Sequence, residues 1–291
     1  MQTTQRGTVI ALLSAFSLTG YVLRMNISVA APFMMADLHL DKVQMGLVFS
    51  AFMWGYALFQ VPWGVPGDRL GPGRTLTWAA ALWALTTGLT GLLPGWVAPA
   101  GLASLAVLMV VRFALGMGQA AAFPVASRAI VSWMPDTRRA QSFAVLIVGM
   151  AIGSAFTPPL VSWAMTTLGW RASFYLSALL AVALWLAWRR SAGAHLDAES
   201  GATPSTGPWH APLRDKNVAV MCVSYFFDSY LLFVFVYWLY LYLVEQRGMS
   251  LLTSAVYTGL PFALAVVFAP IAGWLCDWLS VRIGRAWGRR A

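Results

Sequence analysis

The chain has 291 residues, of which 59% are apolar or aromatic and 10% are charged, and its formal net charge is +9. Its mean hydropathy is +0.70, whereas about a quarter of the residues in average soluble domains are charged. This composition excludes a soluble enzyme, a disulfide scaffold and a disordered regulator, because there is too little polar surface to cover a water-soluble globule. The chain is therefore predicted to be an integral membrane protein.

Eight segments are apolar enough and long enough to cross a bilayer, which takes about 20 mostly apolar residues in a helix. The predicted spans are 8–34, 44–66, 75–97, 102–127, 141–165, 172–188, 217–243 and 252–276. A polar stretch rich in Gly, Ser and Pro follows the sixth span and is interpreted as a cytoplasmic linker. The predicted domains are a six-helix bundle at 1–190, the linker at 191–216 and the start of a second bundle at 217–291.

Basic residues predict the orientation of these spans, since Lys and Arg accumulate in cytoplasmic loops. With a cytoplasmic N-terminus, three basic residues face outside: Lys42, Arg171 and Arg247. Fourteen face inside: Arg6, Arg69, Arg74, Arg128, Arg138, Arg139, Arg189, Arg190, Arg214, Lys216, Arg282, Arg285, Arg289 and Arg290. The positive charge is thus interpreted as a topology signal in a plasma or inner membrane, in contact with the lipid bilayer and not with nucleic acid. No metal or cofactor is expected, because Cys222 and Cys276 lie in apolar stretches and the three histidines are scattered.

An internal repeat links the two predicted bundles. Gly64-x-x-x-Asp68 ends the second span, and Gly273-x-x-x-Asp277 ends the eighth. Two parallel repeats of six spans form one large class of transporters. The chain is therefore predicted to hold one such repeat and the first two spans of another, as a C-terminally truncated fragment of a twelve-span protein; an unusual short form is the alternative.

The loop after the second span is a candidate gate. A carboxylate at a helix end, flanked by arginines, forms charge-assisted pairs with a neighbouring helix, and glycines permit a tight turn. An ordinary positively charged loop is the alternative interpretation. The candidate gating residues are Gly64, Asp68, Arg69, Gly71 and Arg74.

This loop resembles the signature loop of the major facilitator superfamily. Further stretches resemble its anion:cation symporter branch, which includes sialin-like, hexuronate, glucarate and phthalate transporters. These stretches are Arg24–Pro32, Phe49–Tyr56, Arg112–Pro124, Thr157–Pro159 and Gly169–Arg171. The resemblance implies an all-α membrane fold and transport of a small organic anion.

Arg24 is the strongest candidate for binding that anion. A charge deep in a span costs several kcal/mol unless it faces a cavity or a partner, and a guanidinium can bind a carboxylate through two hydrogen bonds. Tyr21 lies on the same helical face, and Tyr56 lies deep in the second span. The resemblance implies that an arginine and tyrosines at these positions contact the substrate. Asn26 is a further candidate, and membrane packing is the alternative role for the tyrosines.

The resemblance also identifies two titratable residues of the branch that this sequence lacks. Gln119 stands where many members of the branch carry Glu, and Leu23 stands where some bacterial members carry Asp, so neither position can titrate. Gln119 is therefore expected to line the substrate cavity. Asp228 is the remaining intramembrane carboxylate. It is predicted to pair with Arg24 across the central cavity, to couple transport to an ion, or to lie at the cavity edge. Arg112 is predicted to influence proton movement or to be neutralised by backbone carbonyls.

These residues predict secondary-active uptake of a small organic anion, such as a sugar acid or another carboxylate, by alternating access. Coupling to a proton or a sodium ion is expected, in a protein that acts as a monomer. Multidrug or metabolite efflux and a non-transporting fragment are the alternatives. No arrangement of catalytic residues is recognisable, so an enzyme is not expected. Gly149-x-x-x-Gly153 is predicted to allow close packing of two helices.

Overall fold

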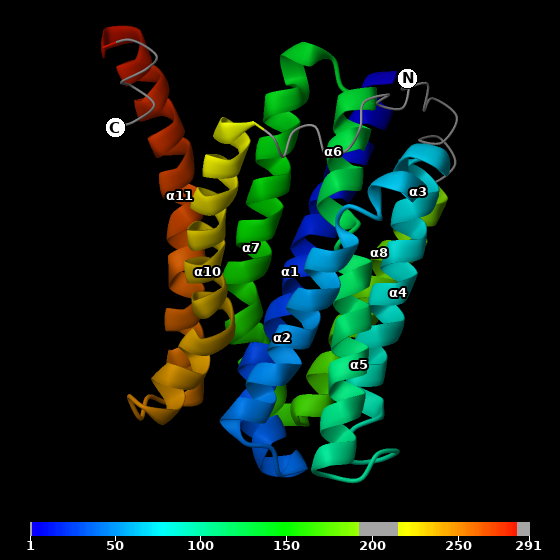
Figure 1. Ribbon diagram of the computed structural model, residues 1–291, viewed down its shortest axis with the longest axis vertical. Coiled ribbons are helices and arrows are strands. Elements are labelled where there is room, and N and C mark those ends of the chain that lie inside the picture. The colour runs from blue at the N-terminus through cyan, green and yellow to red at the C-terminus, as the bar shows by residue number, and fades with distance from the viewer. Residues whose placement is uncertain (1, 192–214, 284–291) are drawn as a thin grey trace.

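The structure is a computed structural model, and it describes residues 2–191 and 215–283. These residues fold into a bundle of long helices (Figure 1). The helices are α1 (Gln2–Leu38), α2 (Lys42–Phe59), α3 (Gly64–Arg69), α4 (Pro72–Leu92), α5 (Leu102–Gln119), α6 (Ala122–Trp133), α7 (Asp136–Leu168), α8 (Trp170–Ser191), α10 (Lys216–Glu245) and α11 (Leu251–Ile283). The fold is that of an all-α membrane protein, as predicted.

The predicted spans correspond to helical rods that run along one axis (Figure 1). Helices α5 and α6 together form one of these rods. Among the described residues, six segments are long and apolar enough to cross a membrane: Gly7–Leu38, Leu102–Trp133, Gln141–Leu168, Trp170–Ser191, Lys216–Glu245 and Leu251–Phe268. The two remaining rods, α2 and α4, are not among these six segments, so the predicted number of eight spans is approximate.

Three predicted spans have boundaries that the structure corrects. The span predicted at 44–66 ends at Phe59, because Pro62 cannot continue the helix. The span predicted at 75–97 ends at Leu92, before a turn in which Gly95 and Gly101 have φ of 79° and 90°. The span predicted at 102–127 is broken between α5 and α6, where Pro124 has no N–H to donate to the carbonyl four residues earlier.

Close backbone contacts hold the bundle around α1, which packs on α7, α8 and α10. A Cβ atom added to Gly149 or Gly153 of α7 would lie 2.6 Å from the carbonyl oxygen of Ser14 or Leu18 of α1. The predicted close packing at this glycine pair is therefore confirmed. In the same way, Gly55 of α2 packs against the backbone of α5, and Gly116 of α5 packs against the backbone of α2.

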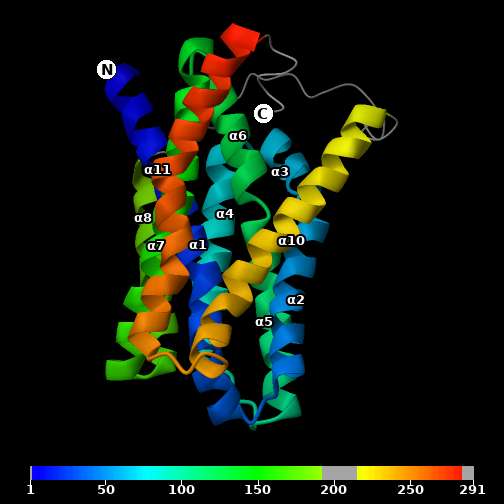
Figure 2. The same ribbon diagram turned by 90° about the vertical axis from the view of Figure 1, so that its left-hand side faces the viewer.

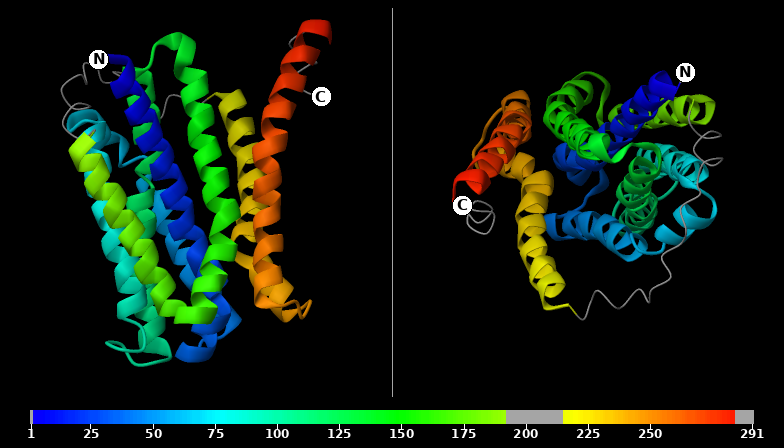
Figure 3. Two further views of the ribbon diagram at one scale, coloured as in Figure 1. Left: turned by 180° about the vertical axis from the view of Figure 1, so that it is seen from behind. Right: turned by 90° about the horizontal axis from the view of Figure 1, so that it is seen from above.

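The last two helices lie on one side of the others, as Figures 2 and 3 show. The buried residues of α10 are confined to its C-terminal third: Val236, Tyr237, Tyr240 and Leu241. Residues 220–228, towards its other end, are exposed. We call the end of the bundle that carries the N-terminus the N-terminal end, and the other the opposite end (Figure 1). Helix α10 is thus packed against the bundle at the opposite end and stands away from it at the N-terminal end. The predicted linker falls mostly on 192–214, outside the described residues.

Candidate functional site

Arg24 lies in the interior of the bundle, 5% exposed, and meets Gln119 across α1 and α5. Its Nε and Nη2 atoms both donate to Gln119 Oε1, at 3.4 and 3.2 Å. The amide group of Gln119 in turn donates through Nε2 to the carbonyl oxygen of Gly20, at 3.0 Å. A neutral side chain therefore holds the two-pronged face of the guanidinium, which is the face that binds carboxylates.

Aromatic rings surround the same guanidinium. Its Cζ atom lies 4.9 Å from the ring centre of Tyr21 and 4.6 Å from that of Tyr56. Phe52 is at 5.1 Å, and Phe233 of α10 is at 5.7 Å. The negative faces of such rings stabilise a buried cation. Tyr21 and Tyr56 are thus adjacent to Arg24, whereas Phe52 and Phe233 were not identified from the sequence, because buried phenylalanines in spans carry no distinctive pattern.

A cavity of about 50 Å³ opens beside these groups. Its volume is enough for about three water molecules, well below the roughly 300–1,000 Å³ of common ligand pockets. Its polar lining comes from Ser17, Tyr21, Arg24, Tyr56 and Gln119. The described residues therefore enclose space for the acidic group of a ligand.

The site carries uncompensated positive charge. Three ion pairs of the described residues lie away from this site: Lys42 with Glu245, Arg128 with Asp68 and Arg171 with Asp37. Within this part of the chain, neither Arg24 nor Arg112 pairs with a carboxylate. A buried charge without a counterion is costly, so Arg24 is a candidate for binding an anion.

Arg112 is fully buried behind the same ring of Phe52, with its Cζ atom 5.3 Å from the ring centre. Its Nη1 atom lies 3.5 Å from the carbonyl oxygen of Leu23. Its Nε and Nη2 atoms have no hydrogen-bond partner among the described residues. One long contact to a carbonyl neutralises this charge only weakly, and Arg112 adds to the positive potential around Arg24.

Two candidates from the sequence lie apart from this cluster. Asn26 is fully buried against α8, where its Nδ2 atom donates to Ser177 Oγ at 2.8 Å and to the carbonyl oxygen of Ser173 at 3.1 Å. This amide is committed to helix packing, because the step of two residues from Arg24 points it to another face of α1. Asp228 is exposed on α10, and no ion pair joins it to Arg24 in the described residues.

The candidate gate is organised by a contact that the sequence did not indicate. Asp68 of α3 pairs with Arg128 of α6. Gly64 and Arg69 begin and end α3, Gly71 makes the turn into α4 with φ of 85°, and Arg74 lies in the first turn of α4. Nothing in the sequence spacing distinguished Arg128 from the other basic loop residues. The corresponding Asp277 side chain lies outside the described residues.

Comparison with known proteins places this architecture in a family. Residues 5–290 match the Major Facilitator Superfamily. The chain belongs to the major facilitator superfamily. Its helices superpose on those of a bacterial homologue of the human lysosomal transporter Spinster, in an inward-facing and occupied conformation, with a TM-score of 0.73 at 18% identity. That match covers 94% of this chain and 61% of the other.

Curated members of the major facilitator superfamily share more of the sequence. The chain is 30% identical to the hexuronate transporter of Bacillus subtilis, over 95% of this chain and 66% of that protein. It is 32% identical to a probable sulfoacetate transporter of Cupriavidus necator, over 91% and 63%. The chain therefore spans slightly less than two thirds of these relatives. It is a multi-pass membrane protein of a transporter family, not an enzyme.

Proposed function

We propose that this protein transports a small organic anion, such as a sugar acid or another carboxylate, and that Arg24 binds the acidic group. The observation that carries the proposal is the buried two-pronged face of Arg24, which contacts the neutral Gln119 and opens on a cavity. A carboxylate entering this cavity replaces the amide oxygen and supplies the missing counterion. We expect the hydroxyl groups of Tyr21 and Tyr56, which line the same cavity, to bond the rest of the ligand.

The names of the relatives support this chemistry. One is described as a hexuronate transporter and another as a probable sulfoacetate transporter. A third, from Escherichia coli, is described as a D-galactonate transporter and is 29% identical over 92% of this chain. Their common feature is a small, polar anion, which suits a site with uncompensated positive charge.

The proposal includes uptake by alternating access. Helix α10 is closed on α2 at the opposite end, where Phe49 stacks on Tyr237 at 4.9 Å and Lys42 pairs with Glu245 at 2.6 Å. It stands away at the N-terminal end, which we propose to be cytoplasmic, near the Asp68–Arg128 gate. This asymmetry supports rocking of α10 against the earlier helices. We further propose that the protein works as a monomer in the plasma membrane, and that Asp228 couples transport to a proton or a sodium ion.

Replacement of Arg24 by lysine tests the site, because lysine keeps the charge and removes the two-pronged geometry. We expect Arg24→Lys to weaken binding of glucuronate and D-galactonate to the purified protein by at least about tenfold, equivalent to about 1.4 kcal/mol. Isothermal titration measures this change. Arg189→Lys, on an exposed guanidinium that lies over Trp185, is the matched control.

Two outcomes contradict the proposal. If Arg24→Lys binds the anions as the parent does, Arg24 is not the binding residue. If the parent binds neither anion but binds lipophilic cations, the efflux alternative replaces anion transport.

A proteoliposome assay tests the proposed coupling through Asp228. The rate of glucuronate uptake by the parent is expected to depend on a pH gradient or on a sodium gradient. Asp228→Asn is expected to lose that dependence.

A further inference from the structure

Arg112 is a buried charge that the proposed binding step at Arg24 does not use. It lies on α5, its side chain is fully buried, and it precedes Gln119 by seven residues, or about two helical turns. Residues at this spacing lie on the same face of a helix. Helix α5 therefore presents Arg112 and Gln119 to the same side of the bundle, and Gln119 is the residue that holds Arg24.

The ring of Phe52 lies close to both guanidinium groups. Its centre is 5.1 Å from the Cζ atom of Arg24 and 5.3 Å from that of Arg112. The two Cζ atoms are thus no more than about 10 Å apart, a separation at which charges inside a protein interact strongly. Helices α2 and α5 fix this arrangement, because a Cβ atom at Gly116 would overlap with the carbonyl oxygen of Phe52.

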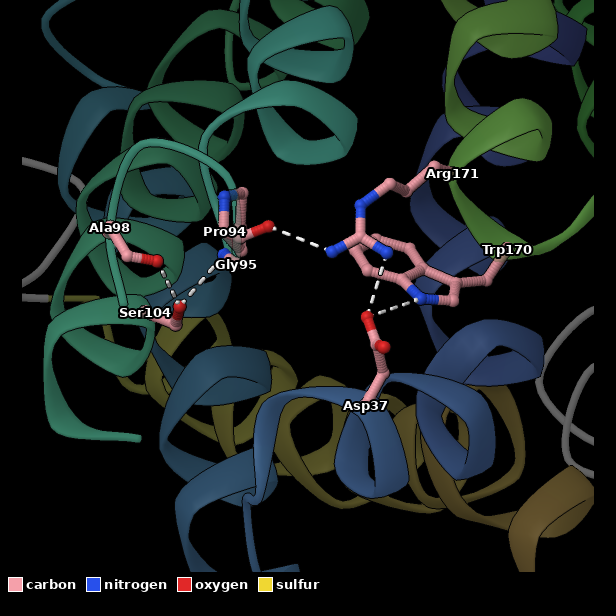
Figure 4. A network of polar contacts seen from close by, with 7 residues as sticks. All are labelled: Asp37, Pro94, Gly95, Ala98, Ser104, Trp170 and Arg171. Carbon is pink, nitrogen blue, oxygen red and sulfur yellow. Dashed lines mark hydrogen bonds and ion pairs between the residues drawn. The ribbon is translucent and has the colours of Figure 1, made fainter. Parts of the chain in front are cut away.

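Arg171 shows how the same fold holds an arginine whose charge is compensated (Figure 4). Its Nη1 atom lies 2.7 Å from Asp37 Oδ2, and its Nη2 atom donates to the carbonyl oxygen of Pro94 at 3.1 Å. Arg112 has a single contact to a carbonyl at 3.5 Å, and its Nε and Nη2 atoms have no partner among the described residues. In this part of the chain, Arg24 and Arg112 are therefore two buried positive charges that no carboxylate pairs with.

The cavity beside Arg24 has a volume of about 50 Å³, which leaves space for a single acidic group. Arg112 does not line this cavity and is fully buried, so a ligand there does not touch it. Its charge acts through space instead, because the Coulomb energy falls only with the inverse of distance and a protein interior screens charges less than water does. A second negative charge therefore has to be carried by the same molecule as the acidic group at Arg24.

We infer that Arg112 determines specificity for the charge of the ligand: it makes the site prefer doubly charged organic anions, such as dicarboxylates, over singly charged anions of the same size. The inference rests on the proposed function, since it needs an acidic group bound at Arg24. Each negative charge of the ligand is stabilised by the field of Arg112, so a dianion gains more than a monoanion. Arg24 binds the first acidic group, and Arg112 favours ligands that carry a second.

D-Glucarate and D-gluconate are a matched pair of ligands for the test. Both are open-chain sugar acids with six carbon atoms, and they differ only in a terminal carboxylate that replaces a hydroxymethyl group. At neutral pH all of their carboxyl groups are ionised. Isothermal titration of the purified parent is expected to show that glucarate binds at least about fivefold more tightly than gluconate. Equal affinities would overturn the inference and leave the proposed function standing, whereas binding of neither anion would overturn both.

Removal of the charge of Arg112 tests the residue itself. We expect Arg112→Gln to weaken glucarate binding at least about fivefold more than gluconate binding, so that the two affinities become nearly equal. A merely structural role for Arg112 would instead weaken the binding of both anions by the same factor. Arg189→Gln is the matched control, because it removes the same charge from an exposed position near the end of α8. It should keep the preference of the parent.

A second neutral variant separates the effect of charge from that of packing. Arg112→Met also removes the charge, but its side chain suits apolar surroundings where the amide of Gln would need partners. Both variants should lose the preference for glucarate to the same extent. A folded variant of either kind that keeps the preference of the parent would overturn the inference. The comparison of glucarate with gluconate in the parent needs no substitution, so it decides the matter even where a variant fails to fold.

Discussion

At the scale of single residues, the contact between Arg24 and Gln119 defines the chemistry of the site. The amide oxygen of Gln119 accepts hydrogen bonds from Nε and Nη2 of the guanidinium without adding charge. The other neighbours of the guanidinium are the rings of Tyr21, Tyr56 and Phe52, and Arg112 lies over the ring of Phe52 as well. The proposed anion site at Arg24 therefore combines a guanidinium with amide and aromatic contacts.

Gln119→Glu changes this balance and is a test at this scale. The new carboxylate pairs with Arg24 and competes with the substrate, so we expect glucuronate binding at neutral pH to weaken about tenfold or more. The comparison is made at neutral pH, where both carboxylates are ionised. Isothermal titration measures this change. Gln44→Glu in the helix cap of α2 should bind as the parent does, and a Gln119→Glu protein that binds glucuronate as tightly as the parent would contradict the assignment.

At the scale of helices, small residues set how closely α1 approaches its neighbours. A Cβ atom at Gly153 would lie 2.6 Å from the carbonyl oxygen of Leu18, whereas one at Gly88 of α4 would lie 3.8 Å from the nearest atom, on Ala178. We expect Gly153→Ala to destabilise the fold by about 1–3 kcal/mol through overpacking. Gly88→Ala should instead be neutral or stabilise it by about 1 kcal/mol, through the higher helix propensity of alanine. Thermal unfolding in detergent compares the two, and equal stabilities would show that α1 and α7 separate freely.

At the scale of the whole molecule, the buried residues of α10 that pack on the earlier helices lie in its C-terminal third. Lys42 and Glu245 pair there at 2.6 Å, with side chains 55% and 29% exposed. Gly46 lies under Trp238, with 3.4 Å between a Cβ atom built at Gly46 and the indole ring. Pairs this exposed contribute about 0.2–1 kcal/mol. The ion pair therefore adjusts the closure of this end, and the aromatic contacts hold it.

Charge reversal tests this closure in a protein with Cys222→Ser, Cys276→Ser and Gly46→Cys. We expect Lys42→Glu to raise the rate of thiol labelling at position 46 by up to about fivefold, the shift that 1 kcal/mol produces. Adding Glu245→Lys should restore the parent rate, because the pair re-forms with opposite sign. Lys216→Glu at the other end of α10 is the control. Unchanged labelling in Lys42→Glu would show that the pair does not hold this end closed.

The class of the protein could be predicted from its amino-acid sequence, because hydropathy and the shortage of charge are properties summed along the chain. Composition predicted a membrane protein, and motifs around Gly64 and Arg24 resembled the superfamily that the comparison then showed. Helix ends were less predictable: the break before Pro124 needs the loss of one specific hydrogen bond, which a hydropathy window averages away.

Which side chains meet could be seen only once the helices were packed together. Arg24 and Gln119 are 95 residues apart, and Asp68 and Arg128 are 60 apart. Asn26 is close to Arg24 in sequence, yet it faces α8 because successive residues on a helix point in different directions. Length, composition and charge thus fixed what the chain is, since these properties sum over residues. The geometry of its sites depends on how rigid helices cross, and no local pattern encodes that crossing.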